Sequence, residues 1–320
     1  MITKIFFCTD IHGSTRCWRK LVSAGEFYRV DTVVLGGDLT GKAVVPIVRQ
    51  NDGTFTSNYL GRRWILKNEK EVEEHKQLIV DGGMYVFEGT HEDLEELRDR
   101  GDRVDGIFRE KVTERIRDWL KIAEINLKPK KRSIIVAPGN DDQEYVDEVL
   151  KESDVIVNGE GKVLALNGVH EMLSSGWSNP TPWHTARECS EDDLNKKIEA
   201  MASQIKNIES SVFNLHVPPF GSGLDAAPKL SENLEVDARE MADVGSTAVL
   251  DAIKKYQPVL GLHGHIHEAA GKRLIGRTLC VNPGSHYTEG ILNGVIVALD
   301  NRGICLLYTS PSPRDRTRAR

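Results

Sequence analysis

Three histidines lie within five positions of the run GLHGHIHEAAG, which spans residues 261–271. They are His263, His265 and His267, and small residues follow them. Neutral imidazole is the most common metal ligand in proteins, and packing alone rarely calls for this density of histidine. The run is therefore typical of a metal site.

Residue types that bind metals also follow four other short apolar runs. Oxygen and nitrogen donors without a thiolate suit manganese, iron or zinc better than calcium. The five cysteines include no Cys-x-x-Cys pair, so the sequence predicts neither a disulfide framework nor a thiolate zinc site. The four places carry, in chain order, Asp10 with His12, Asp38, Asn140, and His216.

The apolar runs before these residues have the length of buried β-strands. The first, ITKIFFCTD, is followed by a loop and by RCWRKLVSAG, which has helical spacing. In α/β folds, the loops beyond the carboxyl ends of parallel strands form the binding crevice, so we expect the five loops to converge. The segment RTLCVNPGSHYTEGILNGVIVALDNRGICLL alternates β-rich runs with turns, which predicts a second sheet and an α/β sandwich.

Taken together, the loop residues resemble the five ordered motifs of the calcineurin-like metallophosphoesterase superfamily. The resemblance extends from residue 6 to residue 267, and HVPPFGSGLD, GHIHEAAG and VNPGSHYTEGIL are similar to predicted phosphoesterases related to cyclic-nucleotide phosphodiesterases. It implies a four-layer αββα sandwich in which two mixed β-sheets are flanked by helices. The motifs are Asp10-x-His12, Gly37-Asp38, Gly139-Asn140, His216 and Gly264-His265-x-His267.

The resemblance also implies how the ligands divide between two divalent metal ions. A bidentate carboxylate can span the roughly 3.5–4 Å between such ions, and a hydroxide that bridges them would attack a phosphate ester, most consistently a phosphodiester. We expect manganese, with iron or zinc as alternatives. One ion is assigned Asp10, His12 and His267, the second is assigned Asn140, His216 and His265, and Asp38 bridges both.

His265 and His267 are expected to serve different ions. Side chains two positions apart on an extended loop point to opposite sides. His263 lies nearer the preceding strand, and we expect it to be a buried, hydrogen-bonded histidine. The remaining histidines at positions 75, 91, 170 and 184 are expected at the surface.

The third motif departs from the family pattern. The family usually reads Gly-Asn-His-Asp/Glu there, with the histidine as proton donor, whereas this chain reads Gly139-Asn140-Asp141-Asp142. Asp141 could donate a proton only if burial or a neighbouring carboxylate, such as Asp142, raised its pKa from about 3.9. We therefore predict catalytic roles for Asn140, Asp141 and Asp142, and a slower or more selective enzyme that favours good leaving groups.

Substrate contacts are predicted from Asn140, from His286 in the loop NPGSHYTEG, and from Arg62. The chain is expected to form a single domain over residues 1–308, with a cap-like insertion at about 41–100 and a non-native or disordered tail at 309–320. A hairpin is expected about Asn51–Gly53. The insertion is read either as a solvated excursion or as a cap over the active site.

A helix is predicted over residues 104–125. Its apolar residues recur at helical spacing and would form one buried face. These are Val104, Ile107, Phe108, Val112, Ile116, Trp119 and Leu120.

Composition limits the partners of the chain. Of its 320 residues, 39 % are hydrophobic and 28 % are charged, and the formal charge of −6 becomes −9 without residues 309–320, which carry four arginines and one aspartate. An acidic body argues against nucleic acid as a partner, and no apolar run approaches the roughly 20 residues of a membrane span. We therefore predict a cytoplasmic protein that acts on a small phosphoester, with no membrane partner and an oligomeric state that the sequence leaves open.

Two other functions remain as alternatives. The first is a nuclease on the same scaffold, for which Arg62, Arg63 and Trp64 form the one compact basic and aromatic group in the insertion. The second is a metal-stabilised interaction module without catalysis. Turnover of a phosphodiester that depends on the metal separates the enzymes from the module.

Overall fold

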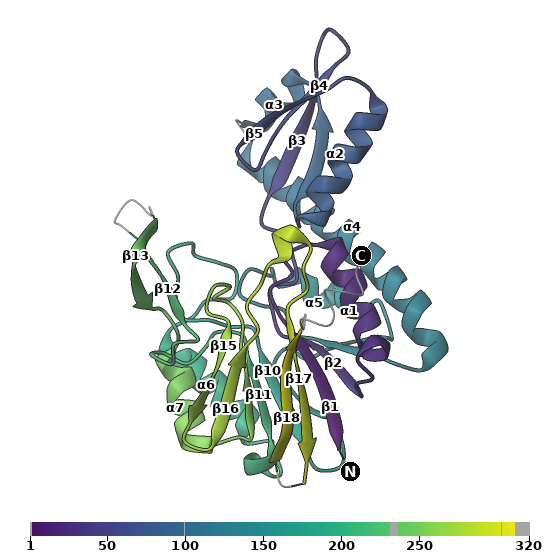
Figure 1. Cartoon of the computed structure of the whole chain (residues 1–320). Helices are drawn as coiled ribbons and strands as arrows, with labels where there is room; N and C mark the ends of the chain where they lie inside the picture. The colour runs from purple at the N-terminus through teal and green to yellow at the C-terminus, as the bar shows by residue number, and fades with distance from the viewer. Residues whose placement is uncertain (1, 99, 231–235, 302, 311–320) are drawn as a thin grey trace.

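The computed structural model of the chain describes residues 2–98, 100–230, 236–301 and 303–310 (Figure 1). Two six-stranded sheets lie face to face, and helices cover their outer faces. This arrangement is the αββα sandwich that the sequence predicts. In the part of the chain that the structure describes, no helix is both long and apolar enough to cross a membrane.

The first sheet has the order β18-β17-β1-β2-β7-β8. The pairs β1–β2, β2–β7 and β7–β8 are parallel, whereas β17 is antiparallel to both β1 and β18. The parallel strands β1, β2 and β7 therefore end at the same edge, beneath the first three motifs. The strands are β1 (Thr3–Cys8), β2 (Thr32–Leu35), β7 (Ile134–Val136), β8 (Ile156–Asn158), β17 (Gly294–Asp300) and β18 (Gly303–Ser310).

The second sheet has the order β15-β16-β14-β11-β10-β9. Its central strands β10, β11, β14 and β16 run parallel, so the last two motifs also follow neighbouring parallel strands. The strands are β9 (Lys162–Ala165), β10 (Glu171–Ser175), β11 (Val212–Leu215), β14 (Leu260–Leu262), β15 (Gly271–Ile275) and β16 (Thr278–Asn282). Separately, β12 (Ala226–Leu230) pairs antiparallel with β13 (Val236–Asp243).

Successive side chains of each strand point to opposite faces of the sheet, so one set packs between the two sheets and the other packs against the outer helices. Ile5 and Phe7 of β1 pack between the sheets, whereas Phe6 and Cys8 pack against helices on the outer face. The helices on the first sheet are α1 (Thr15–Phe27), α4 (Gly101–Leu127) and α5 (Tyr145–Leu150), and those on the second are α6 (Glu191–Ala202) and α7 (Thr247–Tyr256). Short 3₁₀ turns occupy Lys128–Lys130, Ile208–Ser210 and Tyr287–Glu289.

Residues after Lys42 fold into a separate unit at the end of the sandwich where the parallel strands finish (Figure 1). Its four-stranded sheet has the order β5-β4-β3-β6 and its own apolar core, so it is not a solvated excursion. The predicted hairpin at residues 51–53 is present between β3 and β4. The elements are β3 (Val44–Arg49), β4 (Phe55–Tyr59), β5 (Arg62–Leu66), α2 (Glu69–Asp81), β6 (Tyr85–Gly89) and α3 (His91–Arg98).

The start of α4 differs from the prediction. Val104 is 44 % exposed, and Ile107 and Phe108 are only partly buried, so the buried face begins at Val112. The reason is that the first turns of α4 extend beyond the sandwich and lie beside α3 and β6 of the insertion. They pack there through the edge-to-face contact between Phe108 and Tyr85.

Two histidines differ from the prediction as well. His75 and His170 are each 2 % exposed, although they were expected at the surface; His91 and His184 are exposed as predicted. His170 is buried with Nδ1 2.7 Å from the Ser210 carbonyl and Nε2 3.2 Å from the Asp300 carbonyl, so the buried ring keeps polar neighbours. At the end of the chain, β18 continues to Ser310, two residues past the expected boundary at 308, and residues 311–320 of the predicted tail lie outside the described residues.

His75 lies in the core of the insertion without a hydrogen-bond partner. Its ring packs 4.7 Å from that of Trp64 and 6.1 Å from that of Tyr59, and neither ring nitrogen has a partner among the described residues. Burial lowers the pKa of His75, because desolvation disfavours the imidazolium ion. The stability that the neutral form provides is present above the ordinary pKa of histidine and is lost as the pH falls.

We therefore expect His75→Phe to stabilise the insertion by about 1 kcal/mol at pH 8, because a buried unpaired polar group is replaced by a ring of similar shape. The advantage should grow between pH 7 and pH 5. Denaturant unfolding at pH 7 and at pH 5 measures this difference in the free energy of unfolding, and the exposed His91→Phe is the control. Equal losses of stability on acidification in the wild type and His75→Phe would contradict this account.

Candidate metal centre

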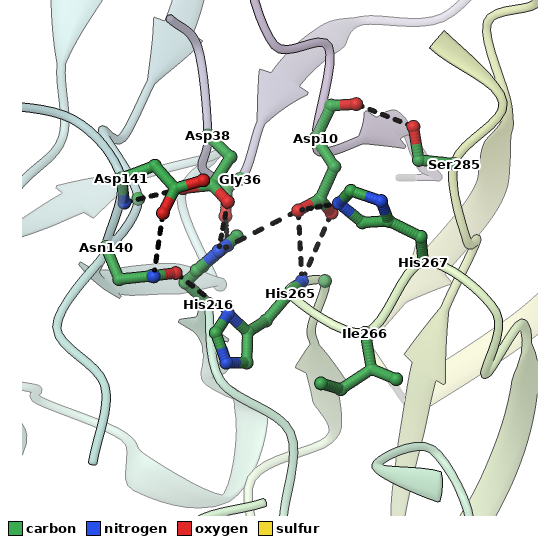
Figure 2. A network of polar contacts seen from close by, with 12 residues as sticks. Asp10, Gly36, Asp38, Asn140, Asp141, His216, His265, Ile266, His267 and Ser285 are labelled. Carbon is green, nitrogen blue, oxygen red and sulfur yellow. Dashed lines mark hydrogen bonds and ion pairs between the residues drawn. The ribbon is translucent and has the colours of Figure 1, made fainter. Parts of the chain in front are cut away.

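Five loops from both sheets meet at the end of the sandwich (Figure 2). They follow β1, β2 and β7 in the first sheet and β11 and β14 in the second. All seven predicted metal ligands lie in these loops, and each is buried except for the partly buried His265 and His267. The convergence that the sequence predicts is therefore present.

The ligand atoms form two groups that share one carboxylate. Atoms of the first group, and likewise those of the second, lie within 4.8 Å of one another. Asn140 joins the second group, because its Oδ1 atom lies 2.8 Å from Nδ1 of His265. The first group is Asp10, His12, Asp38 and His267; the second is Asp38, His216 and His265. This division matches the predicted assignment to two ions.

The environment of His216 fits a cation between the loops. Its Nδ1 atom lies 3.0 Å from the Gly36 carbonyl, an acceptor, so Nδ1 carries a proton. The buried Nε2 atom has no hydrogen-bond partner among the described residues and faces Asp38 at 3.4 Å and Asp10 at 3.8 Å. Burial opposes the charged imidazole, but these carboxylates raise the pKa of His216 to about 10. The two carboxylates thus stabilise a positive charge at this position. A metal ion would supply that charge in place of the proton on His216.

A second convergence involves His12 and His267. Their Nε2 atoms lie 2.9 Å apart, and Nε2 of His267 lies 3.4 Å from Asp10. Burial lowers the pKa of His12 to about 3, with the nearby Lys42 adding to the effect, so this imidazole is neutral. Two imidazoles and a carboxylate that point at one place suit a divalent transition metal.

The ligands are held in unusual backbone conformations. Asp10, His12, Asp38 and His265 have φ angles of 54°, 36°, 49° and 66°, in the left-handed region that residues with a side chain rarely adopt. His265 therefore does not lie on an extended loop as predicted, although it and His267 do face different groups. Such conformations are typical of functional sites.

Hydrogen bonds between the loops maintain these conformations. The Asp10 N–H donates to the Gly37 carbonyl, and the His12 N–H donates to the Asp38 carbonyl, both at 3.0 Å. The His265 N–H donates to the Asp10 carboxylate at 3.1 Å. Gly37 cannot be replaced, since a Cβ atom there would lie 2.0 Å from Nδ1 of His216. The three loops therefore fix one another.

Asp142 braces the loops and is turned away from the predicted catalytic role. Its fully buried carboxylate accepts hydrogen bonds from the N–H groups of Leu39, Thr40 and Gly139 and from the Thr40 hydroxyl, at 2.7–2.9 Å. These four donors saturate both oxygens. Asp142 thus joins the Asp38 loop to the Asn140 loop, and a structural role replaces the catalytic role expected of it.

Asp141 faces the metal groups. Its N–H donates to Asp38 Oδ1 at 3.1 Å, and its Oδ2 atom lies 2.9 Å from Nζ of Lys42. Burial and the Asp38 carboxylate raise the pKa of Asp141 to about 6 against the effect of Lys42, while Asp142 contributes least. Divalent cations beside Asp38 would favour the charged carboxylate. The proton-donor role of Asp141 therefore stays a prediction.

Two of the residues predicted to contact substrate lie outside the ligand groups. His286 is turned toward Asn293, whose Nδ2 atom donates to its Nδ1 at 2.9 Å. Arg62 lies on β5, the edge strand of the insertion sheet, with its guanidinium 4.4 Å from the centroid of the Trp64 ring. Neither side chain belongs to the ligand groups in the described part of the chain.

Several residues of the centre were missed by sequence reasoning. Tyr287, next to the predicted His286, packs its ring 4.7 Å from that of His12. The Thr185 hydroxyl accepts from Asn140 Nδ2 at 2.8 Å, which turns the amide oxygen toward His265. Lys42 stands four residues after Asp38, and that proximity was the one signal in the sequence.

His263 lies outside both ligand groups. It is fully buried, and its Nδ1 atom lies 2.8 Å from the Leu215 carbonyl. The sequence predicts this buried, hydrogen-bonded position. Of the three histidines in the run at 261–271, two therefore face the metal groups and one supports the strand end.

Comparisons with known proteins agree with this fold. No protein-family model matches the sequence. The uncharacterized protein MJ1162 of Methanocaldococcus jannaschii is 26 % identical over 175 residues, which are 53 % of this chain and 73 % of that protein. The crystal structure of TT1561 of Thermus thermophilus has a TM-score of 0.53 at 15 % identity, and the match covers 97 % of this chain and 99 % of that chain.

A second crystal structure matches over the same shares of both chains, with a TM-score of 0.55 and 15 % identity. The phosphoesterase YfcE of E. coli matches with a TM-score of 0.30 and 12 % identity over 96 % of this chain and 98 % of that chain. At these identities the comparisons show the fold alone. The comparisons thus show an α/β sandwich shared with these solved structures over nearly the whole of both chains, and the Asp/His groups of this chain lie in the loops at one end of it.

The bracing role of Asp142 is testable. We expect Asp142→Ala to lower the free energy of unfolding by at least about 3 kcal/mol, since four buried donors lose their acceptor. Asp141→Ala, which removes the adjacent and partly exposed carboxylate, should cost less than half as much. Urea unfolding of the metal-free proteins makes the measurement, and equal losses for the two variants would refute the assignment.

Proposed function

We propose that the chain is a metal-dependent phosphoesterase that holds two divalent ions and acts on phosphodiesters in preference to phosphomonoesters. The observation that carries the proposal is the position of Asp38. Its carboxylate belongs to both ligand groups, as the bridge of a two-metal site must. Nitrogen and oxygen donors without a thiolate favour manganese, with iron or zinc as alternatives.

The residues of the two groups, together with Asn140, would hold the ions. The ions would supply Lewis-acid stabilisation of the phosphoryl oxygens and a nucleophile at neutral pH. The chain supplies orientation: the Gly36 carbonyl fixes the ring of His216, Thr185 fixes the amide of Asn140, and Ser285 donates to the Asp10 carbonyl at 2.6 Å. Such partners around the ligands preorganise a site for charge that develops at phosphorus.

Two observations weigh against the nuclease alternative. The group that suggested it, formed by Arg62, Arg63 and Trp64, lies on the edge strand β5 and is not part of the ligand groups. The formal charge of −6 also argues against a basic surface for nucleic acid. A small phosphodiester therefore remains the preferred substrate class.

The proposal is tested with bis(p-nitrophenyl) phosphate and p-nitrophenyl phosphate after the purified protein is loaded with Mn²⁺. We expect turnover of the diester that a chelator abolishes. His265→Ala should lower kcat/KM at least about 100-fold, because it removes a side chain from the second ligand group. Elemental analysis should show fewer than two ions in this variant, and the exposed His91→Ala should behave as the wild type.

The same measurements identify the non-catalytic alternative. Two bound ions without turnover of either ester, together with a fall in Tm on chelation, would indicate a metal-stabilised module and contradict the enzyme. A protein that holds no ions under any of the metals tested would overturn both.

A further inference from the structure

Lys42 and Asp141 form an ion pair at the exposed side of the metal centre. Nζ of Lys42 lies 2.9 Å from Oδ2 of Asp141. The Lys42 side chain is 46 % exposed, whereas that of Asp141 is 16 % exposed, so the lysine is the more accessible partner of the pair. A ligand that approaches the metal groups past this pair meets Lys42 first.

The position of Lys42 is fixed by its neighbours in the chain. The Gly41 N–H donates to the Tyr85 hydroxyl at 2.9 Å, and Thr40 donates twice to the buried Asp142 carboxylate. Lys42 is thus anchored just before β3 begins, at the root of the insertion. Its flexible side chain starts from a rigid backbone.

The ammonium group lies close to the ligand groups. After burial, Lys42 is the largest influence that lowers the pKa of His12, and its charge also acts on Asp38, His265 and His267. A compact cation at this distance suits an anionic oxygen bound at the centre. No second lysine or arginine is paired with Asp141 in the described part of the chain.

We propose that this pair selects the substrate of the metal centre: Lys42 binds a non-bridging phosphoryl oxygen, and the Asp141 carboxylate disfavours a phosphate that carries a second negative charge. The proposal rests on the proposed function and deepens it. A phosphodiester carries one negative charge and has two esterified oxygens. A phosphomonoester dianion would bring an additional charge close to Asp141, and like charges repel most strongly where water is largely excluded.

Asp141 of this pair lies in the third motif, at the position where the family pattern that the sequence resembles has a histidine. Neither a lysine–aspartate pair at 2.9 Å nor its partial burial follows from the motif itself. The geometry assigns to this pair a role in binding and selection. No proton transfer is required of either residue.

Binding of two anions separates this role from a purely structural one. Isothermal titration calorimetry of the Mn²⁺-loaded protein at pH 8 would compare inorganic phosphate, which is mostly dianionic, with diethyl phosphate, a monoanion. We expect Lys42→Met to weaken the binding of both anions by about tenfold or more, and Lys42→Arg to retain most of the affinity. Asp141→Asn should strengthen phosphate binding relative to diethyl phosphate by about tenfold.

Lys255→Met is the matched control. Lys255 lies on α7, away from the centre, and its side chain is 57 % exposed. Its Nζ atom lies 2.7 Å from Oε1 of Glu199 on α6. This variant should bind both anions as the wild type does. The ratio of kcat/KM for the diester to that for the monoester should fall in Asp141→Asn and remain unchanged in Lys255→Met.

The outcomes distinguish this inference from the proposed function. If the wild type holds two ions and Lys42→Met leaves both affinities unchanged, the inference is wrong while the two-metal centre stands. An equal change of both affinities in Asp141→Asn overturns the selective role of Asp141. If the wild type holds no ions, the proposed function fails and the inference fails with it.

Discussion

The structure depends on the burial of two carboxylates in one small volume. Asp10 and Asp38 are 1 % and 2 % exposed, and both face Nε2 of His216. Burial alone would disfavour two neighbouring anions, yet the histidines around them hold the pKa of Asp10 at about 2 and that of Asp38 well below its usual range. Anions in such surroundings need a compensating cation, which His216 provides only by taking up a proton and which a metal ion would provide in its place.

Positioning these groups requires strained loops, and the sandwich supplies the rigidity to hold them. Four residues of the ligand set have positive φ, which costs of order 1–3 kcal/mol each. The loops are anchored on strands that are buried on both faces, and each loop hydrogen-bonds its neighbours. Asp142 contributes most to this support, because it joins two loops through four donors. Stability of the fold and geometry of the centre are therefore linked.

The sequence predicts which residues converge at the strand ends, but it does not predict the contacts that hold them there. Asp10, Asp38 and His216 follow short apolar runs, and parallel strands bring the ends of such runs together. Asp141 and Asp142 look equivalent in a sequence, but the backbone directs one toward the metal groups and the other toward a set of N–H donors. The burial of His75 could not be predicted, because it depends on rings from β4 and β5 that reach α2 only once the insertion has folded.

The insertion is joined to the metal centre through α4 and through the short segment that precedes β3. Arg115 of α4 donates to the carbonyls of Gly13, in the His12 loop, and of Met84, just before β6. Gly83 lies so close to this loop that a Cβ atom there would be 2.1 Å from the His12 carbonyl. Since the Tyr85 hydroxyl accepts from the Gly41 N–H, a displacement of the insertion would move the backbone on both sides of the metal groups at once. The insertion is therefore mechanically coupled to His12 and Lys42, and its orientation bears on the geometry of the centre whether or not it ever covers the site.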